Sequence, residues 1–172
     1  MIQIKEVSIK ELKELKKIST ETFLDTFGKD NSEEDISKYI ESAYADEKLA
    51  GELSNKNSFF FFAIDNERVI GYLKLNINEA QSEKLLSNSL EVERIYILPE
   101  CKGKGTGKAL IQHAIAFALS KEKDSIWLGV WEHNKNALRF YEKMGFKVMD
   151  EHIFVLGQDE QTDLIMKKDL IQ

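Results

Sequence analysis

Three glycines alternate with lysines and a threonine in the segment Lys102-Gly103-Lys104-Gly105-Thr106-Gly107-Lys108. Residues 90–98 before it alternate apolar and polar side chains up to Pro99, which predicts a strand, and residues 109–120 after it show helical spacing. Glycines let the backbone approach a ligand closely, and the free N–H groups at a helix start attract an anion. The segment therefore predicts a strand, a phosphate-binding loop and a helix in succession, with an ordinary glycine-rich turn as the alternative.

Two familiar phosphate-binding loops do not match this segment. A Walker A loop ends in Gly-Lys-Ser/Thr, whereas Gly107 and Lys108 are followed by Ala109, and Lys102 stands where its first glycine would be. The dinucleotide pattern G-x-G-x-x-G fails because Lys108 and Leu110 stand where its last glycine would be. The loop therefore belongs to another class of phosphate site.

The rest of the chain alternates helices and strands without a linker. Ser8 and Glu11 have capping-box spacing before a helix expected over residues 9–27 and ended by Gly28, and Ser32 precedes a second helix that runs to about Ala43. We further expect a β-hairpin of strands 59–64 and 69–75, a loop or short helix over 78–89, a strand over 125–130, a helix over 134–144, and strands over 146–156 and 162–167. With a single proline and no Gly/Ser-rich stretch, residues 1–172 are expected to form one domain of the α/β (α+β) class with a mixed sheet.

The net charge of −6 is concentrated in one part of the sequence. Nine acidic and three basic residues lie between Thr20 and Ala50, so this window carries the whole excess and the remaining residues are neutral in sum. An acidic segment on a neutral body argues against a nucleic-acid partner, which needs clustered Lys and Arg. It suits a cationic partner, with a solvated helix face as the alternative.

Cysteine content and hydropathy limit the cellular compartment and the kinds of partner to be expected. Cys101 is the single cysteine, which excludes an internal disulfide and is typical of a reducing compartment, so we expect a cytoplasmic protein. The longest apolar runs, 59–64 and 114–119, are far shorter than the ~20 residues of a membrane span, so we expect no membrane partner. The three histidines lack the spacing of metal ligands, and no metal site is predicted.

Two motifs make the chain resemble the GCN5-related N-acetyltransferases, the GNAT family, over most of its length. Residues 102–107 are similar to the family's R/Q-x-x-G-x-G/A loop, with Lys102 where the family more often has Gln or Arg, and residues 134–146 match its N-x-x-A-x-x-F-Y-x-K-x-G-F signature. Residues 22–27, 126–132 and 161–164 further resemble the PaiA-type spermidine/spermine N-acetyltransferases. The resemblance implies the GNAT fold, which is a mixed, mostly antiparallel sheet with splayed strands flanked by helices, and acetyl-CoA as co-substrate.

The resemblance also implies roles for individual residues around acetyl-CoA. The backbone of Ile95, Tyr96 and Ile97 would pair with the pantetheine arm as an added strand would. Asn134 and Lys143 would contact the cofactor, and the loop would hold its pyrophosphate through Lys102, Gly103, Lys104, Gly105, Thr106, Gly107 and Lys108. Tyr141 would protonate the departing thiolate, since a phenol with a pKa of about 10 stays protonated at neutral pH. The alternative for Tyr141 is a tyrosine packed in the core beside Phe140.

An acceptor amine must lose a proton before it attacks, which requires a base or a water relay. Glu91 and Glu93 share one face of the predicted strand, and Glu93 is our candidate for relaying that proton, with a solvated carboxylate as the alternative. In the resembled family the first helices contribute to the acceptor site, and here they carry the acidic window. Candidate contacts for a cationic acceptor are Asp25, Asp30, Glu33, Glu34 and Glu41.

These inferences combine into one expected function with two alternatives. We expect an acetyl-CoA-dependent N-acetyltransferase that transfers acetyl directly to a primary amine of a polyamine within a ternary complex. A protein or peptide amine is the alternative acceptor, and a non-catalytic regulatory module that senses acyl-CoA is the alternative of another class. Both a monomer and a homodimer fit these patterns.

Overall fold

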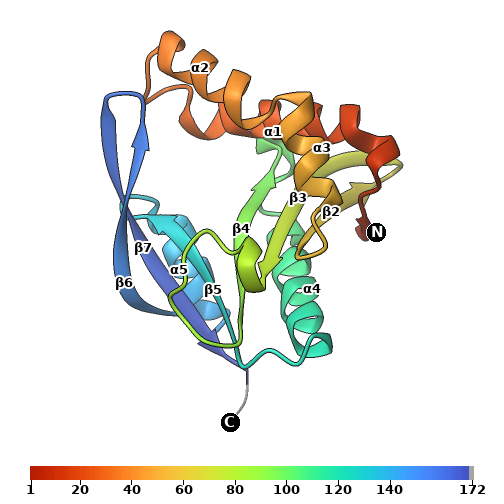
Figure 1. Cartoon of the computed structure of the whole chain (residues 1–172), viewed down its shortest axis with the longest axis vertical. Coiled ribbons are helices and arrows are strands. Elements are labelled where there is room, and N and C mark those ends of the chain that lie inside the picture. The colour runs from red at the N-terminus through yellow and green to blue at the C-terminus, as the bar shows by residue number, and fades with distance from the viewer. Residues whose placement is uncertain (171–172) are drawn as a thin grey trace.

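A seven-stranded mixed sheet forms the centre of the molecule in the computed structural model, which describes residues 1–170 and, among these, all side chains except those of Phe154, Leu156 and Asp159. Its strands are β1 (Gln3–Glu6), β2 (Ser58–Asp65), β3 (Arg68–Ile77), β4 (Ser89–Ile97), β5 (Ser125–Trp131), β6 (Lys147–Leu156) and β7 (Asp159–Asp169). They follow the order β1-β2-β3-β4-β5-β7-β6 (Figure 1). Neighbouring strands are antiparallel except β4 and β5, which run parallel.

Helices flank this sheet. The α-helices of the described residues are α1 (Leu12–Phe27), α2 (Glu33–Ala43), α3 (Asp46–Ser54), α4 (Thr106–Ser120) and α5 (Lys135–Lys143). Figure 1 shows α1, α2 and α3 grouped at one end of the molecule, while α1 contacts β3 and β4, and α4 contacts β3, β4 and β5. None of the helices in the described part of the chain is long and apolar enough to cross a membrane. The helix-flanked, mostly antiparallel sheet confirms the expected fold class.

Local chemistry explains the elements that the sequence predicts well. In the tight turn between β2 and β3, Asn66 and Glu67 both have positive φ angles of 50° and 64°, which matches the right-handed twist of the hairpin strands. Helix α2 begins after Ser32, whose hydroxyl accepts a hydrogen bond from the amide of Asp35 at 3.1 Å. The Ser8 amide donates to Glu11 at 3.0 Å, but the turn it opens is a 3-10 helix, η1 (Ile9–Glu11), and the α-helix begins at Leu12.

The strand β1 and the helix α3 were not expected from the sequence. Strand β1 is four residues long, and only Ile4 among them is sheltered from solvent. Helix α3 buries Leu49 alone. Both elements have too few buried apolar residues to produce a clear period, and both are held by their neighbours: β1 pairs along β2, and α3 contacts α1 and β2.

The centre of the sheet opens between β4 and β5. These two strands pair only over residues 89–92 and 125–128, after which β4 continues along β3 and β5 continues along β7. On β4 the register skips Glu93, because Lys74 lies opposite Arg94 while the next residue, Leu75, lies opposite Val92. Such an extra residue is a β-bulge, which bends the strand and redirects its side chains. The expected splay of the strands is therefore present, and it leaves free backbone edges on either side of a gap.

Candidate active site

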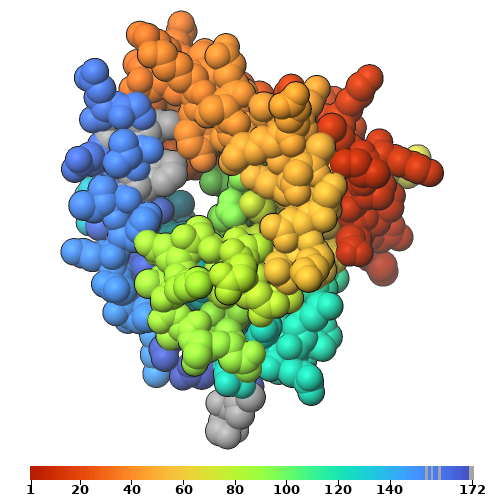
Figure 2. Space-filling view, viewed as in Figure 1, coloured from red at the N-terminus to blue at the C-terminus, as the bar shows by residue number. Residues whose placement is uncertain are grey.

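The gap between β4 and β5 forms the floor of a cavity of about 370 Å³. The β6–β7 hairpin borders it on one side and reaches α2, where Gly157 packs so closely against Asp35 that a Cβ atom would overlap the carboxylate. Figure 2 shows the molecule hollowed between this hairpin, the α1 and α2 helices and the loop of residues 78–88. Lining residues come from α1, α2, α5 and the strands β4, β5, β6 and β7, which are far apart in the sequence.

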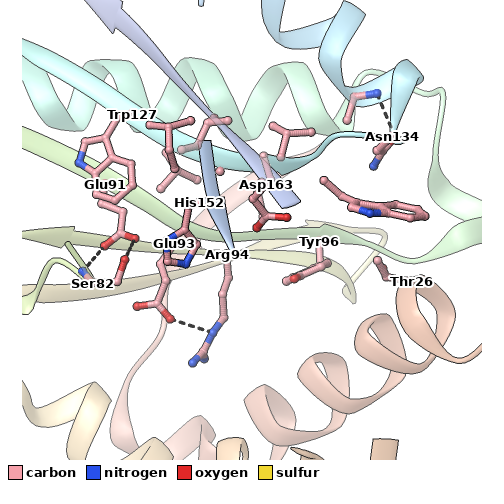
Figure 3. A pocket seen from close by; sticks show the side chains of 18 of the residues that line it. Thr26, Ser82, Glu91, Glu93, Arg94, Tyr96, Trp127, Asn134, His152 and Asp163 are labelled. Atoms are coloured by element: carbon pink, nitrogen blue, oxygen red, sulfur yellow. Dashed lines mark hydrogen bonds and ion pairs between the residues drawn. The ribbon is translucent and has the colours of Figure 1, made fainter. Parts of the chain in front are cut away.

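Two carboxylates of β4 lie side by side at one end of the cavity (Figure 3). The amide of Asn76 donates to Glu91 at 3.0 Å and to Glu93 at 2.8 Å, so both carboxylates point to the same side of the strand, as their spacing predicts. Glu91 also accepts hydrogen bonds from the backbone amide of Ser82 at 2.8 Å and from its hydroxyl. Glu91 is thereby held by three donors and only 4% exposed.

Glu93 belongs to a network of charged side chains that is largely buried. Lys74 donates to it at 2.8 Å, and the Nε atom of Arg94 lies 3.2 Å from its second oxygen. Glu52 of α3 completes the network, since Arg94 approaches both of its oxygens at 3.2 and 3.4 Å and Lys74 lies 3.5 Å away. Arg94 also stacks over the ring of Tyr44 at 5.5 Å. The two cations and two anions compensate one another and fix Glu93 in place.

The two neighbouring carboxylates have pKa values displaced in opposite directions. Burial alone would raise the pKa of Glu93, but the charges of Arg94 and Lys74 outweigh it and hold that pKa below its ordinary value. Burial raises the pKa of Glu91, although the hydrogen bonds from Asn76 and Ser82 oppose the shift. Glu93 is therefore a firmly ionised group, which makes it a good structural anion and a weak base.

A third carboxylate, Asp163 of β7, points into the cavity from the opposite wall (Figure 3). In the sheet it lies opposite Trp131 of β5 and His152 of β6. Burial raises the pKa of Asp163, and the nearby His152 partly opposes the shift. His152 itself is tied by its Nδ1 atom to Glu83 at 2.7 Å, which joins the hairpin to the loop of residues 78–88 across the cavity.

Aromatic rings supply much of the remaining cavity wall. Phe23 of α1 stacks on Tyr39 of α2 with ring centroids 4.4 Å apart and planes 3° from parallel. Phe27, Tyr44, Tyr96, Trp127 and Trp131 line the same space. The helices α1 and α2 thus turn aromatic residues toward the cavity. Such faces attract cations as well as apolar groups.

Tyr141 of α5 lines the cavity and is also part of the core. Its ring packs against Phe140 and Phe146 at 5.1 and 5.8 Å, and the residue is 8% exposed. Burial raises the pKa of its phenol well above the ordinary value, so the hydroxyl is protonated at neutral pH. The two interpretations considered for Tyr141 are therefore compatible, because one side of the ring packs in the core while the residue borders the cavity.

Asn134, which precedes α5, and Ala137 also line the cavity among the residues of the signature. Asn134 supplies the polar group of the two. Its side-chain oxygen accepts a hydrogen bond from the amide of Ala137 at 3.2 Å and so caps the helix (Figure 3). The cap leaves the side-chain N–H groups of Asn134 for a ligand. Lys143, at the end of the same helix, is exposed and does not line the cavity.

The glycine segment forms an open helix start beside β4. Gly103 and Gly105 have φ angles of 77° and 86°, a conformation that favours glycine, and α4 begins at Thr106. No side chain caps α4 and its first turn has no acidic residue, so the first amides of the helix are available to an anion. Gly107 lies between Ile97 and Phe140, which places this helix start next to the end of β4 and to α5. Lys104 and Lys108 are exposed at the same helix start.

The structure brings together some of the expected site residues and separates others. Glu93, Ile95, Tyr96, Asn134 and Tyr141 all line the cavity, whereas the segment 102–108 and Ile97 lie beyond its edge. The five acidic residues expected to contact a cationic acceptor do not line it: Asp25 pairs with Lys102 at 3.3 Å, Glu34 pairs with Lys38 at 2.9 Å, and the others are exposed, namely Asp30, Glu33 and Glu41. The acidic window therefore faces mostly away from the cavity that its helices help to build.

Several charged residues that line the cavity or bind its lining residues were given no role from the sequence. Lys74, Arg94 and Glu52 are single charges within apolar or mixed segments, and only the β3–β4 register and the packing of α3 bring them together. His152, Glu83 and Asp163 meet because β6, β7 and the loop of residues 78–88 border the same space. A charge in the middle of an apolar strand was the one available signal, and it applies to Lys74 alone, because β7 carries several charged residues besides Asp163.

Comparisons with known proteins show that nearly the whole chain is similar to one group of enzymes. A model of the acetyltransferase (GNAT) family matches residues 12–146. An uncharacterized N-acetyltransferase in the pepI 3′ region of Lactobacillus delbrueckii subsp. lactis is 46% identical over 170 residues, which cover 99% of this chain and 98% of that protein. The spermidine N(1)-acetyltransferase of Thermoplasma acidophilum is 31% identical over 173 residues, covering 97% and 96%. The crystal structure of the PaiA N-acetyltransferase from Thermoplasma acidophilum in complex with coenzyme A, also 31% identical, matches with a TM-score of 0.79 over 98% of this chain and 99% of that chain.

Proposed function

Since this chain belongs to the acetyltransferase (GNAT) family and is an acetyl-CoA-dependent N-acetyltransferase, we propose that its acceptor is a primary amine of a polyamine such as spermidine or spermine. One observation carries the proposal: four carboxylates and a set of aromatic rings line one cavity at the splayed strands. The similarity to a spermidine N(1)-acetyltransferase along nearly the whole chain supports it.

The charge balance of the cavity favours a cationic acceptor. Its carboxylates are Glu83, Glu91, Glu93 and Asp163, and its cationic partners are Arg94 and, when protonated, His152. Arg94 already pairs with Glu52 and Glu93, so it does not neutralise the remaining carboxylates. The electrostatic field inside the cavity is therefore negative. An ammonium group that enters would gain from this field and from the aromatic faces. A polyamine offers several such groups along a flexible apolar chain that fits between aromatic walls.

The remaining residues fit acetyl-CoA as the second substrate. The free edge of β4 at Ile95, Tyr96 and Ile97 can pair with the amide-containing pantetheine arm in the manner of an added strand. The uncapped start of α4, with Gly103 and Gly105 in the left-handed conformation and three lysines nearby, suits a pyrophosphate. The side-chain N–H groups of Asn134, just before α5, would be available to the same arm. This arrangement supports the pairing, the anion site and the amide contact that the residues predict.

The proposed chemistry is direct transfer within a ternary complex. The neutral amine of the acceptor attacks the thioester carbonyl carbon, the C–N bond forms, and the C–S bond breaks. The departing thiolate takes a proton from the hydroxyl of Tyr141, which burial keeps protonated and which borders the cavity. The tyrosinate then regains a proton from the amine nitrogen through solvent.

A screen of acceptors tests this proposal directly. Purified protein is mixed with acetyl-CoA and a panel of amines, and free thiol release is followed for spermidine, spermine, short diamines, monoamines, and peptides with a free amino terminus or lysine. We expect the highest kcat/KM for a polyamine and values at least tenfold lower for monoamines. Preference for a peptide would overturn the acceptor class in favour of protein amines. Tight binding of CoA with no transfer to any amine would overturn the catalytic role in favour of a sensing module.

A further inference from the structure

We propose that Asp163 binds the reacting ammonium group of the acceptor and takes its proton, which assigns the base of the reaction to β7 rather than to β4. This assignment deepens the proposed function and rests on transfer to an amine, though not on which amine is preferred. It also departs from the expectation, drawn from strand spacing alone, that Glu93 relays this proton.

The position of Asp163 suits contact with both substrates. Its carboxylate lies over β5, with one oxygen 3.6 Å from the point where a side chain on Gly129 would begin. Gly129 is the residue just past the last β4–β5 pair, so the carboxylate borders the start of the gap between the two strands. Tyr96 of β4 borders the same cavity; burial is the main cause that raises the pKa of its phenol, and Asp163 lies close enough for its charge to add to that shift. Tyr141 borders the same cavity, so the groups proposed to handle the two protons share one space.

The hydrogen bonds of the three carboxylates separate their roles. Glu91 has three donors, and Glu93 has Lys74, Asn76 and Arg94. Among the residues whose side chains the structure describes, by contrast, no hydrogen bond or ion pair engages the carboxylate of Asp163. A partly buried carboxylate without donors gains more from an incoming ammonium group than one that is already saturated.

The surroundings of Asp163 also suit proton transfer. Burial raises its pKa, which brings a carboxylate closer to the neutral pH at which a base works best. The titratable groups that face it are His152 on β6, which opposes the shift, and Tyr96 on β4. Glu83 holds His152 at 2.7 Å, and Arg94 and Glu93 lie on the β4 wall of the same cavity. No described cation other than His152 lies close enough to lower the pKa of Asp163.

The proton balance of the step is closed without a further reactant. The ammonium group gives one proton to the Asp163 carboxylate and becomes a neutral amine with a free electron pair. After attack, the nitrogen loses a second proton, which replaces the one that Tyr141 gave to the thiolate. Asp163 returns its proton to solvent when the acetylated product leaves. The sum is one ammonium and one thioester converted to one amide, one thiol and one released proton.

The first test compares Asp163→Asn with the wild type across pH. The matched control is Asp169→Asn on the same strand, whose carboxylate is 67% exposed and outside the cavity. We expect Asp163→Asn to lose about 100-fold or more in kcat/KM near neutral pH with unchanged affinity for CoA. The loss should shrink as the pH approaches the pKa of a free primary amine, about 10, because the amine is then neutral in solution without the help of a base. A loss below about threefold, or a large loss that does not change with pH, would overturn the assignment.

A second measurement does not depend on how much of the variant is folded. One preparation of Asp163→Asn is given two accepted amines, an ordinary alkylamine and a fluorinated analogue whose weaker basicity leaves it mostly neutral at the assay pH. The ratio of the two kcat/KM values should shift toward the weaker base by about tenfold or more relative to wild type. An unchanged ratio would overturn the proposal while leaving the enzyme an amine acetyltransferase. Absence of turnover by the wild type with every amine would instead overturn the proposed function itself.

Discussion

The two walls of the cavity use the same functional group in opposite ways. On the β4 wall, Glu93 is surrounded by Lys74, Arg94 and Asn76. Burial would raise its pKa, but the two charges and the hydrogen bonds hold that pKa below the ordinary value. On the β7 wall, Asp163 has no described hydrogen bond or ion pair, and burial raises its pKa. The comparison shows that a carboxylate in an active-site cavity is not by that fact a base. The donors around it decide whether it stabilises the fold or reacts.

The largest effect on rate is expected from Tyr141→Phe, which leaves both walls intact. Removing the hydroxyl should lower kcat by about 100-fold or more, because the thiolate then leaves without a proton donor, while ring packing against Phe140 and Phe146 is kept. Raising the pH should not rescue this variant, unlike Asp163→Asn, since a free amine cannot replace the donor. Steady-state kinetics across pH and calorimetric CoA binding check it. Rescue of both variants by high pH would show that the two groups serve the same proton.

The next effect concerns stability and the β4 wall. Lys74 is 5% exposed, bonds Glu93 at 2.8 Å and lies 5.6 Å from the ring centre of Phe60. Replacing it by Met keeps the apolar stem and leaves a buried carboxylate short of a partner, which should cost about 2 kcal/mol in the free energy of unfolding. The effect stays below the upper range for buried pairs because Arg94 still faces Glu93.

A matched control for Lys74→Met is Lys48→Met. Lys48 lies 3.3 Å from Glu52, which Lys74 also approaches, but the side chain of Lys48 is 52% exposed. Removing such a surface pair should cost about 0.5 kcal/mol or less in the free energy of unfolding. Urea unfolding of both variants measures the difference. Equal losses would mean that the buried network contributes no more to stability than a surface ion pair.

The pH dependence of stability should differ in sign between the two walls. Because the folded-state pKa of Glu93 is lowered, the stability it contributes is present above the ordinary value of 4.5 and is lost as the pH falls through the folded pKa. The pKa of Asp163 is raised, so its ionisation costs stability at neutral pH, and that cost disappears below the ordinary value of 3.8.

Two variants read out this difference by urea unfolding between about pH 7 and pH 3. Glu93→Gln should be less stable than wild type at neutral pH, with a gap that narrows on acidification. Asp163→Asn should be at least as stable as wild type at neutral pH, and its advantage should vanish on acidification. For each variant the quantity compared is its free energy of unfolding minus that of the wild type, with its sign. If these two differences change in the same direction on acidification, the two carboxylates do not differ in the way their surroundings indicate.

Local signals in the sequence predicted the parts of the site that depend on backbone conformation. The glycine loop around Gly103 and Gly105, the helix that starts at Asn134 and the hairpin turn at Asn66 each depend on a particular residue type at a particular place. For the same reason the loop and the signature could be located before any strand order was known. The side-by-side arrangement of Glu91 and Glu93 followed from the period of a strand.

Other parts of the site depend on register and packing, which local patterns do not contain. Asp163 enters the cavity because β7 lies between β5 and β6, an order that the chain sequence does not suggest. Arg94 joins Glu93 through a bulge that no residue type marks. The acidic residues of α1 and α2 were expected at the acceptor site, but an amphipathic helix turns its apolar face inward, so Phe23 and Tyr39 line the cavity.

The smallest effect expected links the acidic window to the phosphate loop. Asp25 of α1 pairs with Lys102 at 3.3 Å, and the two side chains are 31% and 55% exposed, so the pair is a surface ion pair worth well under 1 kcal/mol. A CoA pyrophosphate at the start of α4 would compete with Asp25 for Lys102. Asp25→Asn should therefore lower the Kd for CoA by about twofold, which corresponds to about 0.4 kcal/mol.

Asp30→Asn removes the same charge from an exposed position and controls for long-range attraction. Calorimetric titrations of the two variants with CoA separate the two cases, and raising the salt concentration checks that the effect is electrostatic. The gain should appear for Asp25→Asn alone and fade at high salt. Equal gains in both variants would mean that the acidic window acts on CoA only through its overall field. A gain specific to Asp25 would mean that CoA must displace a contact from the helix that also carries Phe23 and Phe27 in the cavity wall, which would couple the two substrate sites.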